Sequence, residues 1–165
     1  MAYCFGLRVH TAAVKALSWC TFQEGLLASG GGTADQFIRL WDVETGECLR
    51  SIPTYSQVCA MVWNKRYREL VSSHGFSFNQ ICVWSFPSMK KLTELKGHTG
   101  RVLHLASSPD GYSVASAAPD CTLQFWKLFP PTIPLPIESL PSPTLPRPSS
   151  DVSSPYRNLD ISNIR

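Results

Sequence analysis

Two sets of residues in this sequence contain the serine, histidine and aspartate of a nucleophilic hydrolase, in which the histidine takes the proton of the serine and the aspartate orients the histidine. The sets are His10, Ser29, Asp35 and Trp41, and His98, Ser116, Asp120 and Trp126. An active site would not recur in one chain. Both serines also lie in the middle of predicted strands, whereas a nucleophile elbow places its serine on a sharp strand-to-helix turn. We therefore predict no catalytic residue and no enzymatic activity.

Both sets belong to a longer pattern that occurs three times and ends each time on a tryptophan. The three openings, at His10, Tyr55 and His98, are 45 and 43 residues apart. A period in the forties, with a Gly-His opening and a Trp-Asp type of ending, is the signature of WD-repeat β-propeller blades. In such repeats the tryptophan, serine, histidine and aspartate form a hydrogen-bonded chain, which is useful only if every buried member has a partner. We therefore assign both sets a structural role.

Each copy contains short strand-like segments with turn residues between them, which is typical of an all-β propeller. The predicted strands are residues 14–19, 26–30, 37–41 and 48–52 in the first copy, 58–63, 69–72, 81–84 and 91–95 in the second, and 102–105, 113–117 and 123–126 in the third. The third copy has no convincing fourth strand. We expect a partial WD-repeat propeller of about three four-stranded antiparallel blades.

The blades are expected to cover residues 10–53, 54–96 and 97–129, after an N-terminal segment of residues 1–9. Propellers typically need about four to eight blades to close, so the chain resembles part of a larger propeller, either a fragment or a short isoform. Residues 3–9 could be the outer strand of a preceding blade or a partner for residues 123–126, and the sequence does not choose between these. Because open blade edges favour association, we expect the isolated chain to associate or to fold only partly.

The second copy departs from the pattern at two positions. Tyr55 stands where the histidine is expected, and Asn79 stands where the aspartate is expected. Neither side chain can form a charged histidine–aspartate link. We therefore predict weaker internal hydrogen bonding in this blade and more dependence on apolar packing.

The composition excludes several classes of function. The net charge is only +3, and no block of Lys and Arg could follow a phosphate backbone, so nucleic-acid binding is not expected. The N-terminus lacks the long apolar run of a signal peptide or membrane anchor. The cysteines lie within or beside strand-like segments without a CxxC spacing, which indicates free thiols in a reducing compartment rather than disulfides or a metal site. No cofactor, membrane or small-molecule partner is predicted.

Residues 130–165 hold most of the 13 prolines and are predicted to form an extended, disordered tail. Their PxxP spacings could bind an aromatic groove. Ser154 precedes Pro155 in a proline-directed phosphorylation pattern, in which phosphate would add negative charge near the basic terminus.

Three stretches are more specific than a generic WD repeat: LLASGGGTADQFIRLWD, SQVCAMVWNKRYRELVSSHGF and GHTGRVLHLASSPDGYSVASAAPDCTLQFWKLF. Together they resemble the C-terminal blades of the fizzy and fizzy-related proteins, which are co-activators of the anaphase-promoting complex, a ubiquitin ligase. The resemblance covers residues 10–129. It implies a non-catalytic propeller that captures short degrons while the ligase transfers ubiquitin, with ligase subunits and degron-bearing substrates as protein partners.

The resemblance also implies binding residues. A KEN-type degron would lie on the top face of the ring, against Thr33, Gln57 and Arg101. Arg101 could pair with the carboxylate of the degron, and Thr33 and Gln57 could bond its amide groups and backbone. The terminal Ile164 and Arg165 match the Ile-Arg dipeptide with which members of this family dock on a helical-repeat subunit of the ligase.

Two departures from the family put full co-activator function in doubt. The destruction-box groove lies between the first and last blades, and its first-blade half is not in this sequence, nor is the N-terminal segment that switches on the ligase. In the family an acidic residue follows the aspartate of the last repeat, but here Cys121 follows Asp120. A thiol is mostly neutral and pairs poorly with arginine.

The sequence leaves two functional alternatives beside the adaptor. The chain could be a truncated regulatory protein that competes with active co-activators without delivering substrates. It could also be a WD-repeat scaffold that binds other partners through its blades or its proline-rich tail. In each case we expect a protein of the cytoplasm or nucleus.

Overall fold

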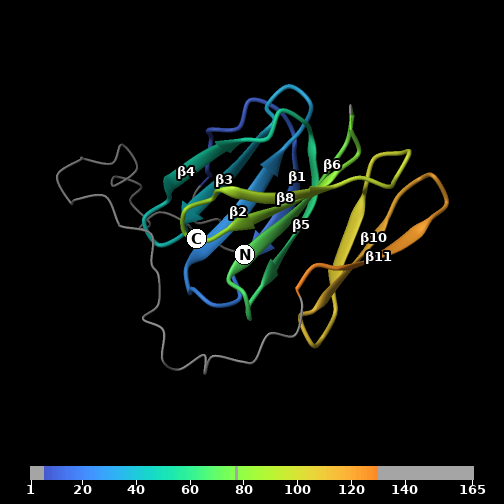
Figure 1. Cartoon of the computed structure of the whole chain (residues 1–165). Helices are drawn as coiled ribbons and strands as arrows, with labels where there is room; N and C mark the ends of the chain where they lie inside the picture. The colour runs from blue at the N-terminus through green and yellow to red at the C-terminus, as the bar shows by residue number, and fades with distance from the viewer. Residues whose placement is uncertain (1–5, 77, 130–165) are drawn as a thin grey trace, which may run out of the picture.

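The computed structural model describes residues 6–76 and 78–129. Within these ranges eleven strands form three antiparallel sheets (Figure 1). The first sheet contains β1 (Val14–Trp19), β2 (Leu26–Gly31), β3 (Phe37–Asp42) and β4 (Glu47–Pro53); the second contains β5 (Val58–Asn64), β6 (Glu69–His74), β7 (Ile81–Ser85) and β8 (Lys91–Leu95); the third contains β9 (His104–Ser107), β10 (Ser113–Ala117) and β11 (Leu123–Lys127). The predicted all-β class is confirmed. None of the described residues forms a helix that is long and apolar enough to cross a membrane.

Hairpin turns at two glycines connect neighbouring strands. Gly46 has φ 75° between β3 and β4, and Gly111 has φ 73° between β9 and β10. Glycine adopts this left-handed conformation without a steric penalty. The carboxylate of Asp42 accepts the amides of Glu44 and Thr45 at 2.9 and 3.2 Å, which fixes the first of these turns. Local sequence therefore closes these hairpins of the first and third sheets.

The three sheets stack side by side, with the sheet β5–β8 in the middle (Figure 1). The first strand of each sheet lies beside the first strand of the next, so that β1 contacts β5 and β5 contacts β9. The last strands, β4 and β8, lie at the opposite margins of their sheets. This is the arrangement of propeller blades around an axis.

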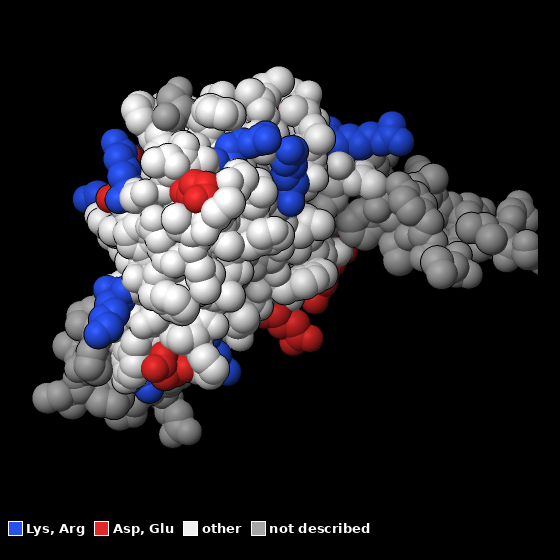
Figure 2. Space-filling model, turned by 90° about the vertical axis from the view of Figure 1, so that its right-hand side faces the viewer, with Lys and Arg blue, Asp and Glu red and all other residues white. Residues whose placement is uncertain are grey.

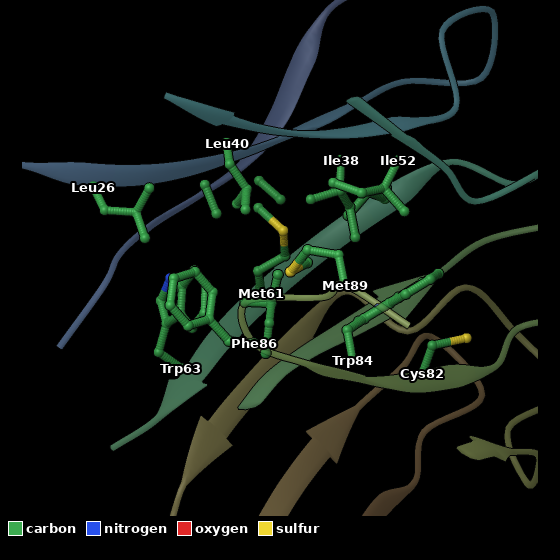
Figure 3. Packing of buried hydrophobic residues seen from close by; sticks show 14 residues of the cluster. Leu26, Ile38, Leu40, Ile52, Met61, Trp63, Cys82, Trp84, Phe86 and Met89 are labelled. Atoms are coloured by element: carbon green, nitrogen blue, oxygen red, sulfur yellow. The ribbon is translucent and has the colours of Figure 1, made fainter. Parts of the chain in front are cut away.

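Apolar side chains fill the space between the first two sheets (Figure 3). Ile38 and Leu40 of β3 are fully buried there, and Met61 and Trp63 of β5 face them from the second sheet. A second cluster, which includes Val83, joins the second sheet to the third. Because each cluster draws residues from two sheets, no sheet has a complete core of its own.

Trp63 makes both ring contacts and a polar contact in the larger cluster. Its ring meets Phe22 and Phe86 edge-on, with centroids 5.4 and 5.7 Å apart. Its indole Nε1 also donates a hydrogen bond of 3.1 Å to the backbone carbonyl of Ser18 in the first sheet. Trp63 thus fastens two sheets by apolar packing and by a hydrogen bond.

The third sheet differs from the prediction at its first strand, which begins at His104 rather than at Val102. The reason is that Val102 bonds to the neighbouring sheet. Its amide donates to the carbonyl of His74 at 3.2 Å, and its carbonyl accepts the hydroxyl of Ser73 at 2.8 Å. The other strands agree with the prediction to within two residues at each end.

The third sheet has three strands among the described residues. Residues 6–9 are described but belong to no strand, and residues 1–5 lie outside the described ranges. The predicted tail of residues 130–165, with Ser154, Ile164 and Arg165, also lies outside them.

Candidate peptide-binding face

The first set of Trp, Ser, His and Asp residues forms a continuous hydrogen-bonded chain. The indole of Trp41 donates to Ser29 Oγ at 2.7 Å, and this oxygen lies 2.5 Å from His10 Nε2. On the other side of the ring, His10 Nδ1 lies 2.6 Å from Asp35 Oδ2. Ser29 is buried and its oxygen is held between an indole and an imidazole, so the hydroxyl is poorly placed to attack a substrate.

Asp35 receives more partners than the sequence predicted. The amide and hydroxyl of Thr11 donate to it at 3.0 and 3.1 Å, and Arg39 Nη1 donates to both of its oxygens. Burial alone would raise the pKa of Asp35, but the bonds from Thr11, His10 and Arg39 outweigh burial and lower this pKa. Arg39 is a buried cation that sequence analysis missed, and a charged residue at a buried strand position is the signal that could have revealed it.

The matching set in the third sheet has the same geometry. Trp126 Nε1 donates to Ser116 Oγ at 2.8 Å, this oxygen lies 2.8 Å from His98 Nε2, and His98 Nδ1 lies 2.9 Å from Asp120 Oδ2. The hydroxyl of Thr122 bonds to Asp120 and lowers the pKa of this carboxyl, as His98 does. In both sets the side chains connect strands and loops within one sheet.

The second sheet keeps part of the chain with a different histidine. Trp84 Nε1 donates to Ser72 Oγ at 2.7 Å, and this oxygen lies 2.8 Å from Nε2 of the fully buried His74. His74 stands on β6 itself, two residues after Ser72. We expected Tyr55 at the place of the histidine, but Tyr55 is exposed. Counted from the first residue of β5, the matching position is Thr54, which is buried.

We expected Asn79 at the position of the aspartate, but Asn79 lies one residue after that position. Phe78 lies six residues before Trp84, as Asp35 lies before Trp41, so Phe78 takes the position of the aspartate. The next position has a left-handed backbone in every sheet: Gln36 (φ 58°), Asn79 (φ 49°) and Cys121 (φ 62°). Asparagine adopts this conformation more readily than most residues. The side-chain Nδ2 of Asn79 donates a hydrogen bond of 3.1 Å to the backbone carbonyl of Thr99, and so connects the second sheet to the third.

The burial of His74 predicts a loss of stability in mild acid. Burial lowers the pKa of His74 to about 4, although Glu94 opposes this shift. In the unfolded chain His74 binds a proton near pH 6.5. The contribution of neutral His74 to the free energy of unfolding is therefore complete above that pH and declines as the pH falls towards 4. We expect the free energy of unfolding to drop by about 2 kcal/mol between pH 7 and pH 5 from this residue.

Urea denaturation at the two pH values would measure this loss in the wild type and in His74→Gln. The variant should lack the histidine-dependent part of the drop, because glutamine does not titrate. Equal pH dependence in the two proteins would contradict the assignment.

The three predicted binding residues come from three loops on one face of the stack. Gln57 and Arg101 lie 44 positions apart and precede Val58 and Val102 respectively, while Thr33 follows β2. The hydroxyl of Thr33 donates to Gln57 Oε1 at 3.1 Å. Gln57 is the link between the first and second sheets on this face, and Arg101 extends the face towards the third.

Gly75 and Phe76 support this group, and sequence analysis did not identify either of them. A Cβ at Gly75 would lie 3.1 Å from Arg101 Cγ and 3.7 Å from Gln57 Oε1, so the absence of a side chain lets both residues approach. The guanidinium of Arg101 lies 5.8 Å from the ring centroid of Phe76. Ser56 Oγ donates to the carbonyls of Gly75 and Phe76 at 3.2 and 2.8 Å and fixes the loop. A glycine followed by an aromatic residue directly after a strand is the sequence signal that could have indicated that Gly75 and Phe76 support this face.

Two polar groups of the face lack a hydrogen-bond partner among the described residues. Gln57 is buried, and its Nε2 has no hydrogen-bond partner in the described part of the chain. Arg101 is exposed, and no hydrogen bond or ion pair joins it to a described residue. A buried amide donor without a partner carries a free-energy cost that a bound acceptor would remove. The exposed guanidinium of Arg101 can pair with a carboxylate from solvent, whereas Gln57 Nε2 is enclosed and would have to turn outward to meet an acceptor.

The described residues contain no cluster of three or more His, Cys, Asp or Glu side chains that could hold a metal ion. Cys121, the residue that departs from the family pattern, is exposed beside Asp120, and its Sγ lies 3.9 Å from the carbonyl of Pro119. The thiol is thus accessible from solvent at the open end of the third sheet.

Comparison with known proteins agrees with this fold. The family model described as WD domain, G-beta repeat matches residues 3–42 and 89–127. The matched ranges leave out residues 43–88, which include β5, β6 and β7 of the second sheet and Phe78 at the aspartate position. In a crystal structure of the mitotic checkpoint complex, one chain superposes with a TM-score of 0.70 at 41% identity, over 73% of this chain and 37% of that chain.

Curated relatives are more similar in sequence. The anaphase-promoting complex subunit cdc20 of Dictyostelium discoideum is 61% identical over 73% of this chain, and the cell division cycle 20.1 cofactor of Arabidopsis thaliana is 58% identical over 74%. The protein FIZZY-RELATED 3 of Arabidopsis thaliana is 55% identical over 75%. The chain spans about a quarter of the length of these relatives, 24 to 27%. By these identities and by its WD-repeat sheets, the chain belongs to the fizzy and fizzy-related family of WD-repeat proteins.

Proposed function

We propose that this chain is a non-catalytic adaptor of the anaphase-promoting ubiquitin ligase, which binds short degron peptides on the face formed by Thr33, Gln57 and Arg101. The names of its relatives, a subunit and a cofactor of that complex, support the adaptor role. The single observation that supports peptide binding is the exposed guanidinium of Arg101, which has no ion pair among the described residues and lies beside Gln57 at Gly75.

A KEN-type degron suits the chemistry of this face. Its glutamate would form a charge-assisted bond with Arg101, which is stronger than a bond between neutral groups. Its asparagine or its backbone carbonyls would accept the unpartnered N–H of Gln57 once this side chain turns outward, since its oxygen is already used by Thr33. Phe76 is exposed and would cover one side of the peptide.

Direct titration tests the proposal. A fluorescent peptide with a KEN motif is added to the full chain, and its anisotropy is followed in parallel with that of a peptide in which all three motif residues are alanine. Saturable binding of the first peptide alone is expected. Equal binding of the two peptides, or no binding of either, would contradict the proposed face.

Docking on the ligase is assigned to Ile164 and Arg165, which lie outside the described residues. Deletion of both residues is expected to abolish capture of the chain by the purified ligase and to leave KEN-peptide binding unchanged. Alanine replacement of Ser149 and Ser150, two other residues of the tail, is the matched control and should leave capture intact. Undiminished capture of the deletion variant would exclude the dipeptide as the docking element.

Arginine-bearing destruction boxes are expected to bind poorly even to a ring completed with further blades, because Cys121 offers a neutral thiol to the arginine. Introducing a carboxylate by Cys121→Glu should strengthen binding of such a peptide several-fold, and Cys121→Gln, of the same shape without the charge, should not. A titration of the completed propeller would measure this. Equal, tight binding to wild type and Cys121→Glu would refute the role of Cys121.

A second function is favoured by Cys121. A chain that has the docking dipeptide and binds destruction boxes poorly would occupy the ligase and compete with active co-activators. The expected sign of this function is inhibition of ubiquitin transfer in a reaction that contains a full-length co-activator. Stimulation in the same reaction would favour substrate delivery.

A further inference from the structure

Two exposed phenylalanines stand at the boundary between the second and third sheets. Phe76 and Phe78 follow β6, are exposed by 71% and 59%, and belong to neither apolar cluster. In Figure 1 their loop lies at the upper right, near the segment that follows β8. Figure 2 looks onto this side of the molecule, and its Lys and Arg groups lie mostly in the upper part, with uncharged surface between them. Neighbouring exposed rings favour a contact with another molecule.

Hydrogen bonds hold the loop after β6 against the segment that follows β8. The amide of Val102 donates to the carbonyl of His74 at 3.2 Å, and Asn79 Nδ2 donates to the carbonyl of Thr99 at 3.1 Å. The two phenylalanines lie in sequence between the residues that make these bonds. Their backbone is therefore fixed on both sides, while their rings remain exposed.

Each ring has a cation from the neighbouring segment beside it. The guanidinium of Arg101 lies 5.8 Å from the ring centroid of Phe76, and Lys96 Nζ lies 4.6 Å from the ring centroid of Phe78. The face of an aromatic ring attracts a cation at such distances. Both cationic residues are exposed. The surface thus presents two apolar rings with a positive charge at each.

The end of β8 keeps an excess of positive charge. Lys91 and Lys96 share the carboxylate of Glu94, with nitrogen–oxygen distances of 2.8 and 3.3 Å. Ion pairs between exposed side chains contribute little to stability. Lys96 can therefore exchange Glu94 for a carboxylate of a ligand at little cost.

Phe78 has lost the structural role of its repeat position. In the other two sheets this position holds Asp35 and Asp120, each of which bonds to the histidine of its set. The second sheet obtains its histidine from β6 instead, as His74, and Phe78 points to solvent. An exposed aromatic residue at a position that elsewhere serves the fold suggests a role in binding.

We propose that acidic residues just before the degron, in the same substrate chain, bind along an aromatic strip formed by Phe76, Phe78, Lys96 and Arg101. This inference rests on the proposed function. When the glutamate of the motif meets Arg101 and its asparagine meets Gln57, the residues before the motif lead away from Gln57, over the two rings and towards Lys96. Because Lys96 follows β8 at the margin of its sheet, the strip leads outward from the binding face.

The chemistry of the strip suits an extended acidic segment. A carboxylate forms a charge-assisted bond with an ammonium group such as that of Lys96. The exposed faces of Phe76 and Phe78 can cover the apolar stems of the same segment. A basic segment would be repelled by both cations. The strip therefore selects, among KEN-type degrons, those that aspartate or glutamate residues precede.

Anisotropy titrations of the full chain with three KEN-type peptides test the proposal. The core peptide has neutral flanks of glycine and serine, the second has aspartates before the motif, and the third has the same aspartates after it. The second peptide is expected to bind about three-fold to ten-fold more tightly than the core peptide, as one or two exposed charge pairs would allow. The third should bind as the core peptide does, and high salt should reduce the gain of the second.

Two variants assign the gain to the strip. Lys96→Ala and Phe78→Ala should each remove most of it and leave binding of the core peptide unchanged, whereas Lys96→Arg and Phe78→Tyr should retain it. Lys65→Ala is the matched control, because Lys65 is an exposed lysine at the opposite end of β5 from Gln57, and it should keep the full gain.

The outcomes separate the strip from the binding face. A core peptide that binds without a gain from preceding aspartates would overturn the strip and leave the proposed function standing. An equal gain from aspartates on either side of the motif would also overturn the strip, because it indicates unspecific attraction. A gain that survives in Lys96→Ala and Phe78→Ala would have the same consequence. A core peptide that does not bind would overturn the proposed function, and the strip with it.

Discussion

Replacement of Trp63 by alanine is expected to lower the free energy of unfolding by about 3–5 kcal/mol, the usual cost of truncating a buried tryptophan. The ring is buried between two sheets and is in edge-on contact with Phe22 and Phe86. Its loss would also leave the carbonyl of Ser18 without the indole donor. Because small domains have only about 5–15 kcal/mol of stability, this change should come close to unfolding the chain.

Urea denaturation at a fixed protein concentration would measure the loss. Trp63→Phe should cost clearly less, because it keeps most of the apolar volume and gives up the hydrogen bond to Ser18. Phe78→Ala removes an exposed aromatic ring and should change stability by less than about 0.5 kcal/mol. A loss below about 1 kcal/mol for Trp63→Ala would contradict the view that the seam between the first two sheets holds the fold together.

Replacement of Arg101 by alanine is expected to weaken binding of a KEN-type peptide by roughly ten-fold to a hundred-fold. This range corresponds to about 1.5–3 kcal/mol for a hydrogen bond to a charged group. Arg101 is free of hydrogen bonds to described residues, so its removal should leave the fold intact. Arg50→Ala, which changes an exposed arginine on β4, is the matched control and should bind as the wild type does.

A double-mutant cycle would show whether Arg101 contacts the acidic residue of the peptide. Changing the glutamate of the motif to glutamine should weaken binding to the wild type, and it should have little further effect on Arg101→Ala. Additive losses would mean that the two groups do not interact. Anisotropy titrations of the four combinations supply the cycle.

The repeated pattern predicted the fold because each copy supplies its own strands, turns and hydrogen-bonding residues. The His10 and His98 sets repeat the same residue types, and the structure brings their members into contact. The second sheet was harder to predict. Loop lengths differ between copies, so the aspartate has no fixed distance from the opening: Asp35 lies 25 residues after His10, and Asp120 lies 22 after His98. Counting back from Trp84 assigns Phe78, and not Asn79, to the aspartate position.

His74 shows a different limit of prediction from sequence. It replaces the missing histidine from within β6, and only the three-dimensional packing shows that its ring reaches Ser72. The binding face has a similar limit. Thr33, Gln57 and Arg101 are polar loop residues without a pattern of their own, and family resemblance alone selected them. Gly75 contributes because it has no side chain between Gln57 and Arg101, and its neighbours in the sequence do not indicate that these two residues lie there.

The central claim is that a short peptide binds where Thr33, Gln57 and Arg101 meet. The most direct test is a titration of the isotopically labelled chain with a KEN-type peptide, followed by NMR signals of backbone and side-chain amides. The account predicts that the side-chain amide of Gln57 and the backbone amides of Thr33, Gly75 and Arg101 shift most, because the peptide pairs with Arg101 and Gln57 Nε2 turns outward to gain a partner. Largest shifts on β11 or on the Phe78 loop, with Gln57 unchanged, would contradict it.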